Sequence, residues 1–136
     1  MTTNNDILFY EFRCFTEKNG NLVPIESNID VPFPIKRVFY VYDVKDNDVR
    51  GQHAHYKTEQ VLVCLSGVVE VSCCDGKSWS HFVLDSPKKA LFIPEMIWDE
   101  QVYHEGSILC VFANQKYSRE DYIFDMERFK ELKNDE

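Results

Sequence analysis

Two histidines separated by one residue, His53 and His55, are the side chains of this 136-residue chain that are best suited to chemistry. Residues i and i+2 of an extended strand point to the same face, so the spacing predicts two imidazoles side by side in one space. Two adjacent imidazoles can bind a metal ion, or they can move protons on and off carbon. Glu59 follows four residues after His55 and suits either chemistry, as a metal ligand or as an orienting partner for a histidine.

The segment that carries these histidines resembles the first half of the motif of the cupin superfamily. Gly51 precedes the histidine pair, Glu59 follows it, and an apolar run over residues 61–65 leads to a turn at Gly67. In metal-binding cupins, two histidines and a glutamate join a further histidine from a later strand in holding one divalent ion. The resemblance therefore implies a barrel whose mouth carries either a metal site or a proton-transfer site.

The spacing of the candidate ligands leaves the metal-dependent alternative open. On a straight strand Glu59 would lie about 13 Å from His55, so shared ligation requires a turn within residues 56–58. The last ligand is expected just after Trp98, where the chain carries Asp99 instead of histidine. Two histidines and a carboxylate also bind non-haem iron, so Asp99 could replace the missing imidazole in a cupin dioxygenase or epimerase.

The elements that must position these residues are short strands separated by turn residues. Strand-like runs occupy residues 7–15, 22–26, 36–44, 68–73, 78–84, 90–93, 98–103 and 108–113. This pattern predicts an all-β protein, a single cupin-type antiparallel β-barrel or jelly roll formed as one domain over residues 1–136. Ser118 and Asp121 resemble a capping box, and apolar residues recur at helical spacing beyond them, which predicts a short C-terminal α-helix over residues 117–133.

The composition of the chain excludes several classes of function. The formal net charge of −8 repels nucleic acid, and no apolar stretch approaches the length that spans a membrane. We therefore expect no nucleic-acid partner and no membrane association. The N-terminal residues lack the basic start and apolar core of a secretion signal, so we expect a cytoplasmic protein. The five cysteines lie mostly in apolar strand-like runs without zinc-site spacing, which is typical of reduced thiols that pack as small apolar residues.

Five runs of sequence make the resemblance more specific than the cupin superfamily. They are residues 35–40, 50–55, 59–65, 84–87 and 121–123. In this order they closely resemble the sugar-nucleotide 3,4-ketoisomerases of the WxcM-like branch of cupins. The resemblance implies conversion of dTDP-4-keto-6-deoxyglucose to a dTDP-3-keto-6-deoxyhexose for the synthesis of bacterial surface sugars. It also implies a homodimer that works without a metal or an organic cofactor.

Moving a ketone to the neighbouring carbon requires a base and a hydrogen-bond donor, and the histidine pair can supply one of each. The reaction removes the proton at carbon 3, passes through an enediolate and returns a proton to carbon 4. A neutral histidine is a suitable base near neutral pH, and hydrogen-bond donors must face the oxygen that gains charge. By resemblance to the family, His55 shuttles the proton, while His53 is placed to donate to the oxygen. Tyr40 or Tyr42, which share one strand face, would complete proton transfer at the oxygens.

The nucleotide part of the substrate needs contacts of its own. Arg37 and Arg50 are the candidates for the pyrophosphate, because a guanidinium offers several fixed donors to paired oxygens. Gln52 lies beside the histidines and is expected to join the polar groups that converge on the ligand. Trp98 has a flat apolar face that suits the sugar or the thymine.

Three further residues complete the expected site. Without a metal, Glu59 is interpreted as an orienting partner for a histidine. Asp99 and Asn19 depart from the residues that the family commonly carries at these positions, and both are expected near the sugar, where they bear on the configuration at carbon 4. A cupin that binds a sugar nucleotide without converting it remains a second alternative to the metal-dependent enzyme.

Overall fold

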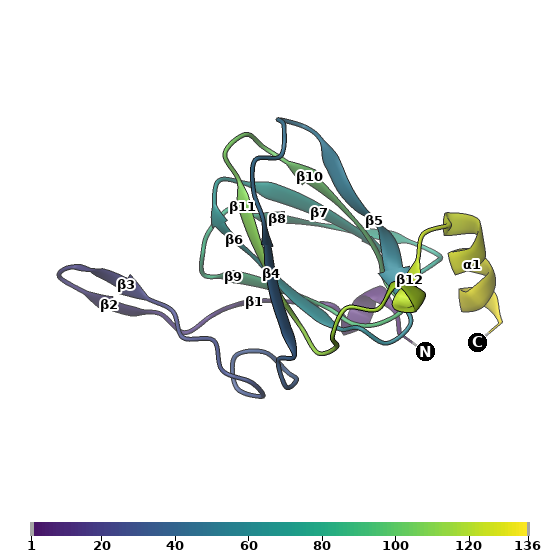
Figure 1. Cartoon of the computed structure of the whole chain (residues 1–136), viewed down its shortest axis with the longest axis horizontal. Helices are drawn as coiled ribbons and strands as arrows, with labels where there is room; N and C mark the ends of the chain where they lie inside the picture. The colour runs from purple at the N-terminus through teal and green to yellow at the C-terminus, as the bar shows by residue number, and fades with distance from the viewer. Residues whose placement is uncertain (1, 136) are drawn as a thin grey trace.

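The computed structural model describes residues 2–135, which form two five-stranded sheets packed face to face with a hairpin projecting from one end (Figure 1). The strands are β1 (Leu8–Glu11), β2 (Phe15–Glu17), β3 (Gly20–Leu22), β4 (Arg37–Val41), β5 (Val49–His55), β6 (Gln60–Ser66), β7 (Val69–Cys74), β8 (Trp79–Leu84), β9 (Lys89–Ile93), β10 (Trp98–Tyr103), β11 (Ile108–Ala113) and β12 (Tyr122–Ile123). The helices are η1 (Asn4–Asp6), η2 (Arg119–Asp121) and α1 (Met126–Asn134).

The order of strands is that of a jelly roll. The first sheet runs β1-β9-β6-β11-β4, the second runs β12-β5-β10-β7-β8, and β2 and β3 form the separate hairpin. Neighbouring strands within each sheet are antiparallel. The expected all-β, cupin-type jelly roll with a short C-terminal helix is therefore confirmed.

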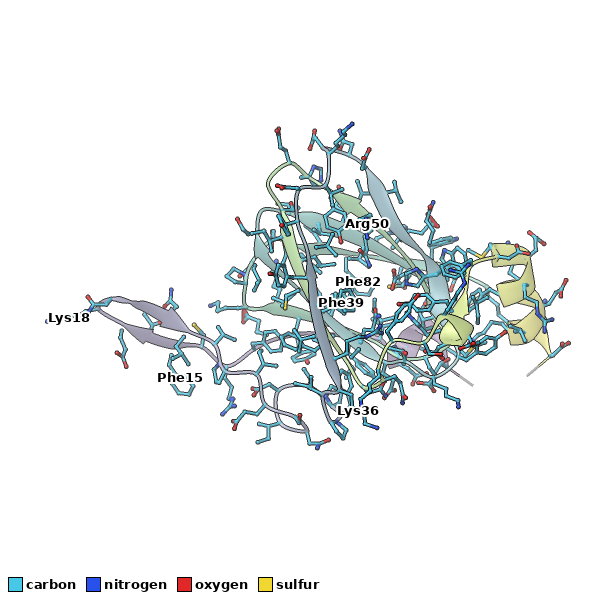
Figure 2. The ribbon with its side chains drawn as sticks, viewed as in Figure 1. Phe15, Lys18, Lys36, Phe39, Arg50 and Phe82 are labelled. Carbon is cyan, nitrogen blue, oxygen red and sulfur yellow. The ribbon has the colours of Figure 1, made fainter. Side chains whose placement is uncertain are left out.

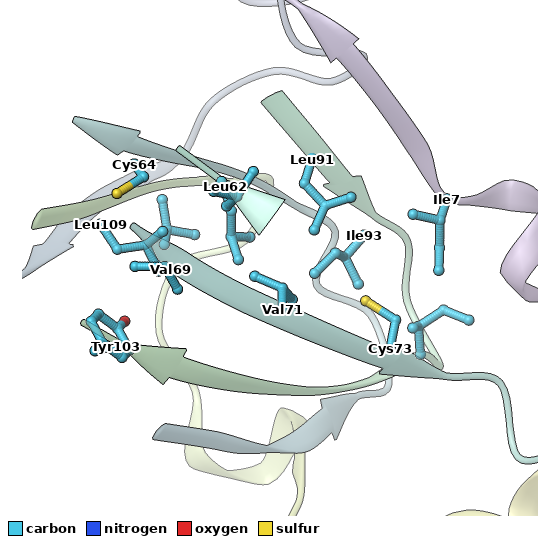
Figure 3. Close-up of a cluster of buried hydrophobic side chains, with 13 residues drawn as sticks. Ile7, Leu62, Cys64, Val69, Val71, Cys73, Leu91, Ile93, Tyr103 and Leu109 are labelled. Carbon is cyan, nitrogen blue, oxygen red and sulfur yellow. The ribbon is translucent and has the colours of Figure 1, made fainter. Parts of the chain in front are cut away.

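The core lies between the two sheets because alternate residues of several strands direct apolar side chains toward the partner sheet. Leu62 and Leu109 project from the first sheet and meet Val71 and Tyr103 of the second, and each side chain is at most 1% exposed. Figure 3 shows this cluster, to which Cys64 and Cys73 also belong. All five cysteines are free, and four of them are buried, as expected of thiols that act as small apolar residues.

The N-terminal quarter of the chain differs from the expected pattern. The run over residues 7–15 divides into β1, which pairs with β9, and β2, which belongs to the projecting hairpin. The expected strand over residues 22–26 ends at Leu22, because Pro24 has no backbone N–H to donate to a partner strand. No helix within residues 2–135 is long and apolar enough to cross a membrane.

The C-terminal helix is shorter than the expected residues 117–133. It begins at Met126, with the carboxylate of Asp125 accepting a hydrogen bond from the backbone of Glu127. The apparent capping box at Asp121 fails because that carboxylate accepts from the backbone amides of Lys57 and Thr58 instead. Residues 117–125, which we call the C-terminal strap, therefore run as a single 3-10 turn and the short strand β12 along the edge of β5 (Figure 1).

Candidate active site

A cavity of about 290 Å³ lies between the sheets and is walled on one side by the C-terminal strap. Its lining residues are Phe39 and Val41 from β4, Arg50, Gly51 and His53 from β5, Gln60 from β6, Gln101 from β10, Leu109 and Val111 from β11, and Tyr117, Tyr122 and Phe124 from the strap. Arg50 and Phe39 come from opposite sheets and both lie at this inner space (Figure 2). Convergent polar groups in an aromatic-walled hollow are the usual composition of a ligand site.

A bulge in β5 turns the first histidine into this cavity. Gly51 and Gln52 have φ angles of 82° and 58°, and the pairing with β10 slips between Asp99 and Glu100. An extra residue in one strand of a pair reorients the side chains around it. His53 consequently lines the cavity, whereas Gln52 is exposed and does not line it. The expected role of Gln52 in ligand binding thus has no support from its position.

The imidazole of His53 is held in the form that a general base requires. Its Nδ1 lies 3.0 Å from the carbonyl oxygen of Gly51, which can only accept, so Nδ1 carries the hydrogen and Nε2 keeps its lone pair. Burial lowers the pKa of His53 below its usual value, although the bond to Gly51 opposes that effect. His53 is therefore neutral at pH 7 with Nε2 available to accept a proton.

The second histidine lies behind the first and is more deeply buried. The ring of His55 is 4.9 Å from that of His53 and 4.5 Å from that of Tyr122, and the residue is 5% exposed. Its buried Nε2 has no hydrogen-bond partner among the described residues. Burial lowers the pKa of His55 to about 3, with a further contribution from His53, while the carboxylate of Asp121 opposes the change.

The strap covers both histidines with aromatic rings. Tyr122 packs 4.9 Å from His53 and stacks on Phe124 at 5.3 Å, and Tyr117 lies 5.7 Å from Tyr122. The backbone of Tyr122 pairs with that of His55, which fixes the position of the Tyr122 ring along β5. Sequence reasoning missed these residues because the expected helix over 117–133 concealed them, although Tyr122 belongs to the matched run over residues 121–123.

Two arginines without an acidic partner among the described residues lie near the cavity: Arg50 lines it, and Arg37 packs on two of its lining residues. The guanidinium of Arg37 lies 5.3 Å from the ring of Phe39 and 5.7 Å from that of Tyr117, and its buried Nε makes no hydrogen bond to residues 2–135. Arg50 is exposed at the cavity and pairs in register with Gln101. A buried guanidinium N–H without a partner is costly, so an acceptor supplied by a ligand suits this position.

Four of the expected site residues lie elsewhere in this chain. Tyr40 and Tyr42 are 65% and 60% exposed, because the alternation of β4 directs Phe39 and Val41 inward and the tyrosines outward. Trp98 is 4% exposed and packs against Phe129 of α1, with ring centroids 5.9 Å apart. Asn19 lies at the turn of the projecting hairpin (Figure 1). The expectation that these residues line the same cavity is wrong for the single chain.

The acidic residues of the cupin motif do not form a metal-ligand set with the histidines among the described residues. The side chain of Glu59 accepts a hydrogen bond from Asn114, and burial, together with the neighbouring Glu95, raises the pKa of Glu59 to about 7. Asp99 accepts from Gln101, and burial raises its pKa to about 7. Within residues 2–135, no three His, Cys, Asp or Glu side chains are arranged to hold a metal ion. The donor set that a cupin metal requires is not assembled, and Glu59 is not placed to orient a histidine.

The burial of His55 predicts a pH dependence of stability. Its folded-state pKa of about 3 lies below the unfolded value near 6.5, so the stabilisation is complete above pH 6.5 and is lost as the pH falls toward 3. We expect acidification from pH 7 to pH 5 to lower the free energy of unfolding of the wild type by up to about 2 kcal/mol more than that of His55→Asn. Denaturant titrations at the two pH values measure this difference, and equal losses in the two proteins would contradict it.

The two sheets, the bulged histidine strand and the cavity together define the chain as a cupin-type protein with a candidate ligand site between its sheets. The family model described as WxcM-like, C-terminal (FdtA) matches residues 5–134. A curated relative from Aneurinibacillus thermoaerophilus, TDP-4-oxo-6-deoxy-alpha-D-glucose-3,4-oxoisomerase, is 40% identical over 120 residues, which are 88% of this chain and 86% of the relative.

Solved structures of similar proteins have the same architecture. The 3,4-ketoisomerase QdtA from Thermoanaerobacterium thermosaccharolyticum, in complex with TDP, superimposes with a TM-score of 0.93 at 33% identity and 97% coverage of both chains. A 3,4-ketoisomerase from Helicobacter canadensis gives a TM-score of 0.92 at 34% identity, covering 95% of this chain and 98% of that one. The chain therefore belongs to the WxcM-like sugar-nucleotide ketoisomerase family of cupins.

Proposed function

We propose that this protein is a 3,4-ketoisomerase that converts dTDP-4-keto-6-deoxyglucose to a dTDP-3-keto-6-deoxyhexose. The observation that carries the proposal is the neutral His53, which lines the cavity, is held by the carbonyl of Gly51 and keeps Nε2 available. A relative in the same family is named for this activity. A His-to-Asn variant of the Thermoanaerobacterium enzyme was obtained in complex with TDP-4-keto-6-deoxyglucose, so that relative holds the same substrate.

The reaction requires one base that serves both carbons. Nε2 of His53 removes the proton at carbon 3, and the electron pair of that bond forms the carbon–carbon double bond of an enediolate as the ketone oxygen at carbon 4 becomes negative. A proton moves from the oxygen at carbon 3 to that at carbon 4. The imidazolium then returns its proton to carbon 4, and the carbonyl forms at carbon 3. This assignment gives His53 the role that the resemblance gave to His55.

The neighbours of His53 support this assignment. His55 lies behind His53, and its ring packs edge-on against that of His53 at 4.9 Å, so we assign it to positioning the base. The proton transfer between the two oxygens, first attributed to Tyr40 or Tyr42, is better assigned to Tyr117 or Tyr122, which line the cavity. The strap thus closes the site and contributes to the chemistry.

The two arginines supply positive charge for the pyrophosphate. Arg50 and Arg37 have no acidic partner among residues 2–135, and charge-assisted contacts to a phosphate contribute about 1.5–3 kcal/mol each. We expect Arg50→Ala to raise KM by about one to two orders of magnitude with kcat within a few-fold, because the contact is equal in the ground and transition states. Arg128→Ala, which removes the same charge from the exposed face of α1, is the matched control. A loss confined to kcat would place Arg50 at the reacting sugar instead.

A homodimer is part of the proposal. The outer face of the first sheet exposes Val38, Tyr40 and Leu65, and an apolar groove of about 490 Å³ separates that face from the hairpin. The edge strand β1 also has unpaired backbone groups on one side, which a second copy would cover. A monomeric mass by light scattering at micromolar concentration would count against the dimer.

We also propose a cytoplasmic location, since a charged nucleotide sugar does not cross a bilayer unaided. The same proposal includes a role in bacterial surface-sugar synthesis.

A coupled reaction tests the activity. The purified protein is incubated with dTDP-4-keto-6-deoxyglucose and a sugar 3-aminotransferase with its amino donor, and a 3-amino sugar is the expected product. NMR of that product gives the configuration at carbon 4. Absence of the 3-amino sugar, with dTDP still bound by the protein, would favour a cupin that binds the sugar nucleotide without converting it.

A further inference from the structure

Three polar side chains form a hydrogen-bonded row on the inner face of β10. The phenolic hydroxyl of Tyr103 donates to Oε1 of Gln101 at 2.8 Å, and Nε2 of Gln101 donates to Oδ1 of Asp99 at 3.2 Å. Tyr103 is fully buried, and Asp99 and Gln101 are 2% and 8% exposed. Buried polar groups that satisfy one another in this way hold a fixed geometry. Of the three, Gln101 is the one that lines the cavity.

The row fixes which end of the Gln101 amide donates. Oδ1 of Asp99 accepts a hydrogen bond from the amide nitrogen of Gln101. Oδ1 accepts both when Asp99 is ionised and when Asp99 carries its proton on Oδ2, so the amide nitrogen faces Asp99 in either state. The amide oxygen is occupied by Tyr103. A carboxamide nitrogen carries two hydrogens, and Asp99 uses one of them. Gln101 therefore retains one N–H that no described side chain accepts.

The lack of a side chain at Gly51 leaves room for the Gln101 amide at the cavity that the proposed base also lines. A Cβ at Gly51 would lie 3.5 Å from Nε2 of Gln101 and only 2.8 Å from Oδ1 of Asp99, so the absent side chain leaves room for the amide. The carbonyl of the same glycine holds Nδ1 of His53. Gly51 thus lies next to both the proposed base and the amide, and His53 and Gln101 line the same cavity.

We propose that Gln101 is a catalytic residue, which donates its remaining Nε2 hydrogen to the sugar oxygen that carries the charge of the enediolate. Asp99 and Tyr103 are the positioning residues that hold its amide. The inference rests on the proposed ketoisomerase function and extends it to a neutral donor that stabilises the charge without competing as an acid. Donors of this kind, aimed at a developing oxyanion in a site that excludes water, contribute about 10²–10³-fold to turnover.

Gln101→Met is the direct test, because methionine has a similar length and no donor. We expect kcat to fall by about two orders of magnitude, with the affinity for dTDP within threefold of the wild type by calorimetry. Tyr103→Phe, which frees the amide to rotate, is expected to lower kcat by roughly tenfold and to leave KM unchanged. Gln101→Glu, which preserves the shape but turns the donor into an acceptor, is expected to be at least as inactive as Gln101→Met. Turnover within threefold of the wild type in Gln101→Met would overturn the proposal.

A binding measurement separates failure of this inference from failure of the proposed function. In the His53→Asn background, where the substrate is expected to stay unreacted, the ratio of the dissociation constants for dTDP and dTDP-4-keto-6-deoxyglucose reports the contact with the sugar. We expect Gln101→Met to lower the ratio of the dissociation constant for dTDP to that for dTDP-4-keto-6-deoxyglucose at least threefold. An unchanged ratio would overturn Gln101 as a sugar contact. If the wild type does not isomerise, the function fails, and this ratio still decides the role of Gln101.

Discussion

His53→Asn is expected to lower kcat by about 10²–10⁴-fold while the protein still folds and binds dTDP. The imidazole of His53 is neutral and its Nδ1 hydrogen is directed at the carbonyl of Gly51, so Nε2 is the atom that we propose as the proton acceptor. An asparagine amide occupies similar space but cannot accept a proton near neutral pH. Single-turnover assays and dTDP calorimetry on the same preparation measure the two expectations separately.

His55→Asn is the matched control, because it makes the same chemical change two residues away. His55 is 5% exposed and contacts His53 and Tyr122. We therefore expect His55→Asn to lower kcat by roughly tenfold, because the substitution displaces those neighbours. The reverse pattern, with His55→Asn inactive and His53→Asn nearly normal, would restore the assignment that the resemblance first implied.

Gly51→Ala is expected to damage both stability and activity. Gly51 has a φ of 82°, and an added Cβ would lie 2.8 Å from Oδ1 and 3.1 Å from the backbone oxygen of Asp99. The backbone strain is worth about 1–2 kcal/mol and the overpacking about 1–3 kcal/mol, so the free energy of unfolding should fall by roughly 2–5 kcal/mol. The clash also displaces the carbonyl that orients His53, and kcat should fall more than tenfold.

Gly106→Ala separates the two causes. Gly106 has a φ of 80°, but no atom lies within 4 Å of its added Cβ. The free energy of unfolding of Gly106→Ala should fall only by the backbone strain of about 1–2 kcal/mol, and its kcat should equal that of the wild type. Urea unfolding and kcat for both variants make the comparison, and equal losses of stability at the two glycines would show that contact with Asp99 is unimportant.

The strand pattern and the histidine pair were predictable because both depend on local spacing. In the run ending at Ala113, the alternate residues Leu109 and Val111 lie in the core between the sheets, as the period of two along a strand predicts. The spacing of His53 and His55 correctly predicts adjacent imidazoles, with rings 4.9 Å apart. Local pattern alone is sufficient for these features because they lie within one strand.

The remaining features of the site depend on contacts between distant segments. Alternation showed that Tyr40 and Tyr42 share a face, but only the packing of β4 against the second sheet shows that this face is outside. Asp121 matches a helix-capping signal, yet its carboxylate binds the amides of Lys57 and Thr58, more than sixty residues earlier in the sequence. Gln101 had no signal beyond its place two residues after Asp99 on the same strand face.

The most direct test of the central claim is ¹H NMR of dTDP-4-keto-6-deoxyglucose incubated with the wild type in deuterated water. Transfer of the ketone through an enediolate predicts a 3-keto product with deuterium at carbon 4, because the proton on His53 exchanges with solvent before it returns. The same spectrum should show no deuterium at carbon 5 beyond that of an enzyme-free control. Deuterium at carbons 3 and 5 with the ketone still at carbon 4 would identify an epimerase, and an unchanged sugar would identify a binding protein; either result would contradict the assignment as a 3,4-ketoisomerase.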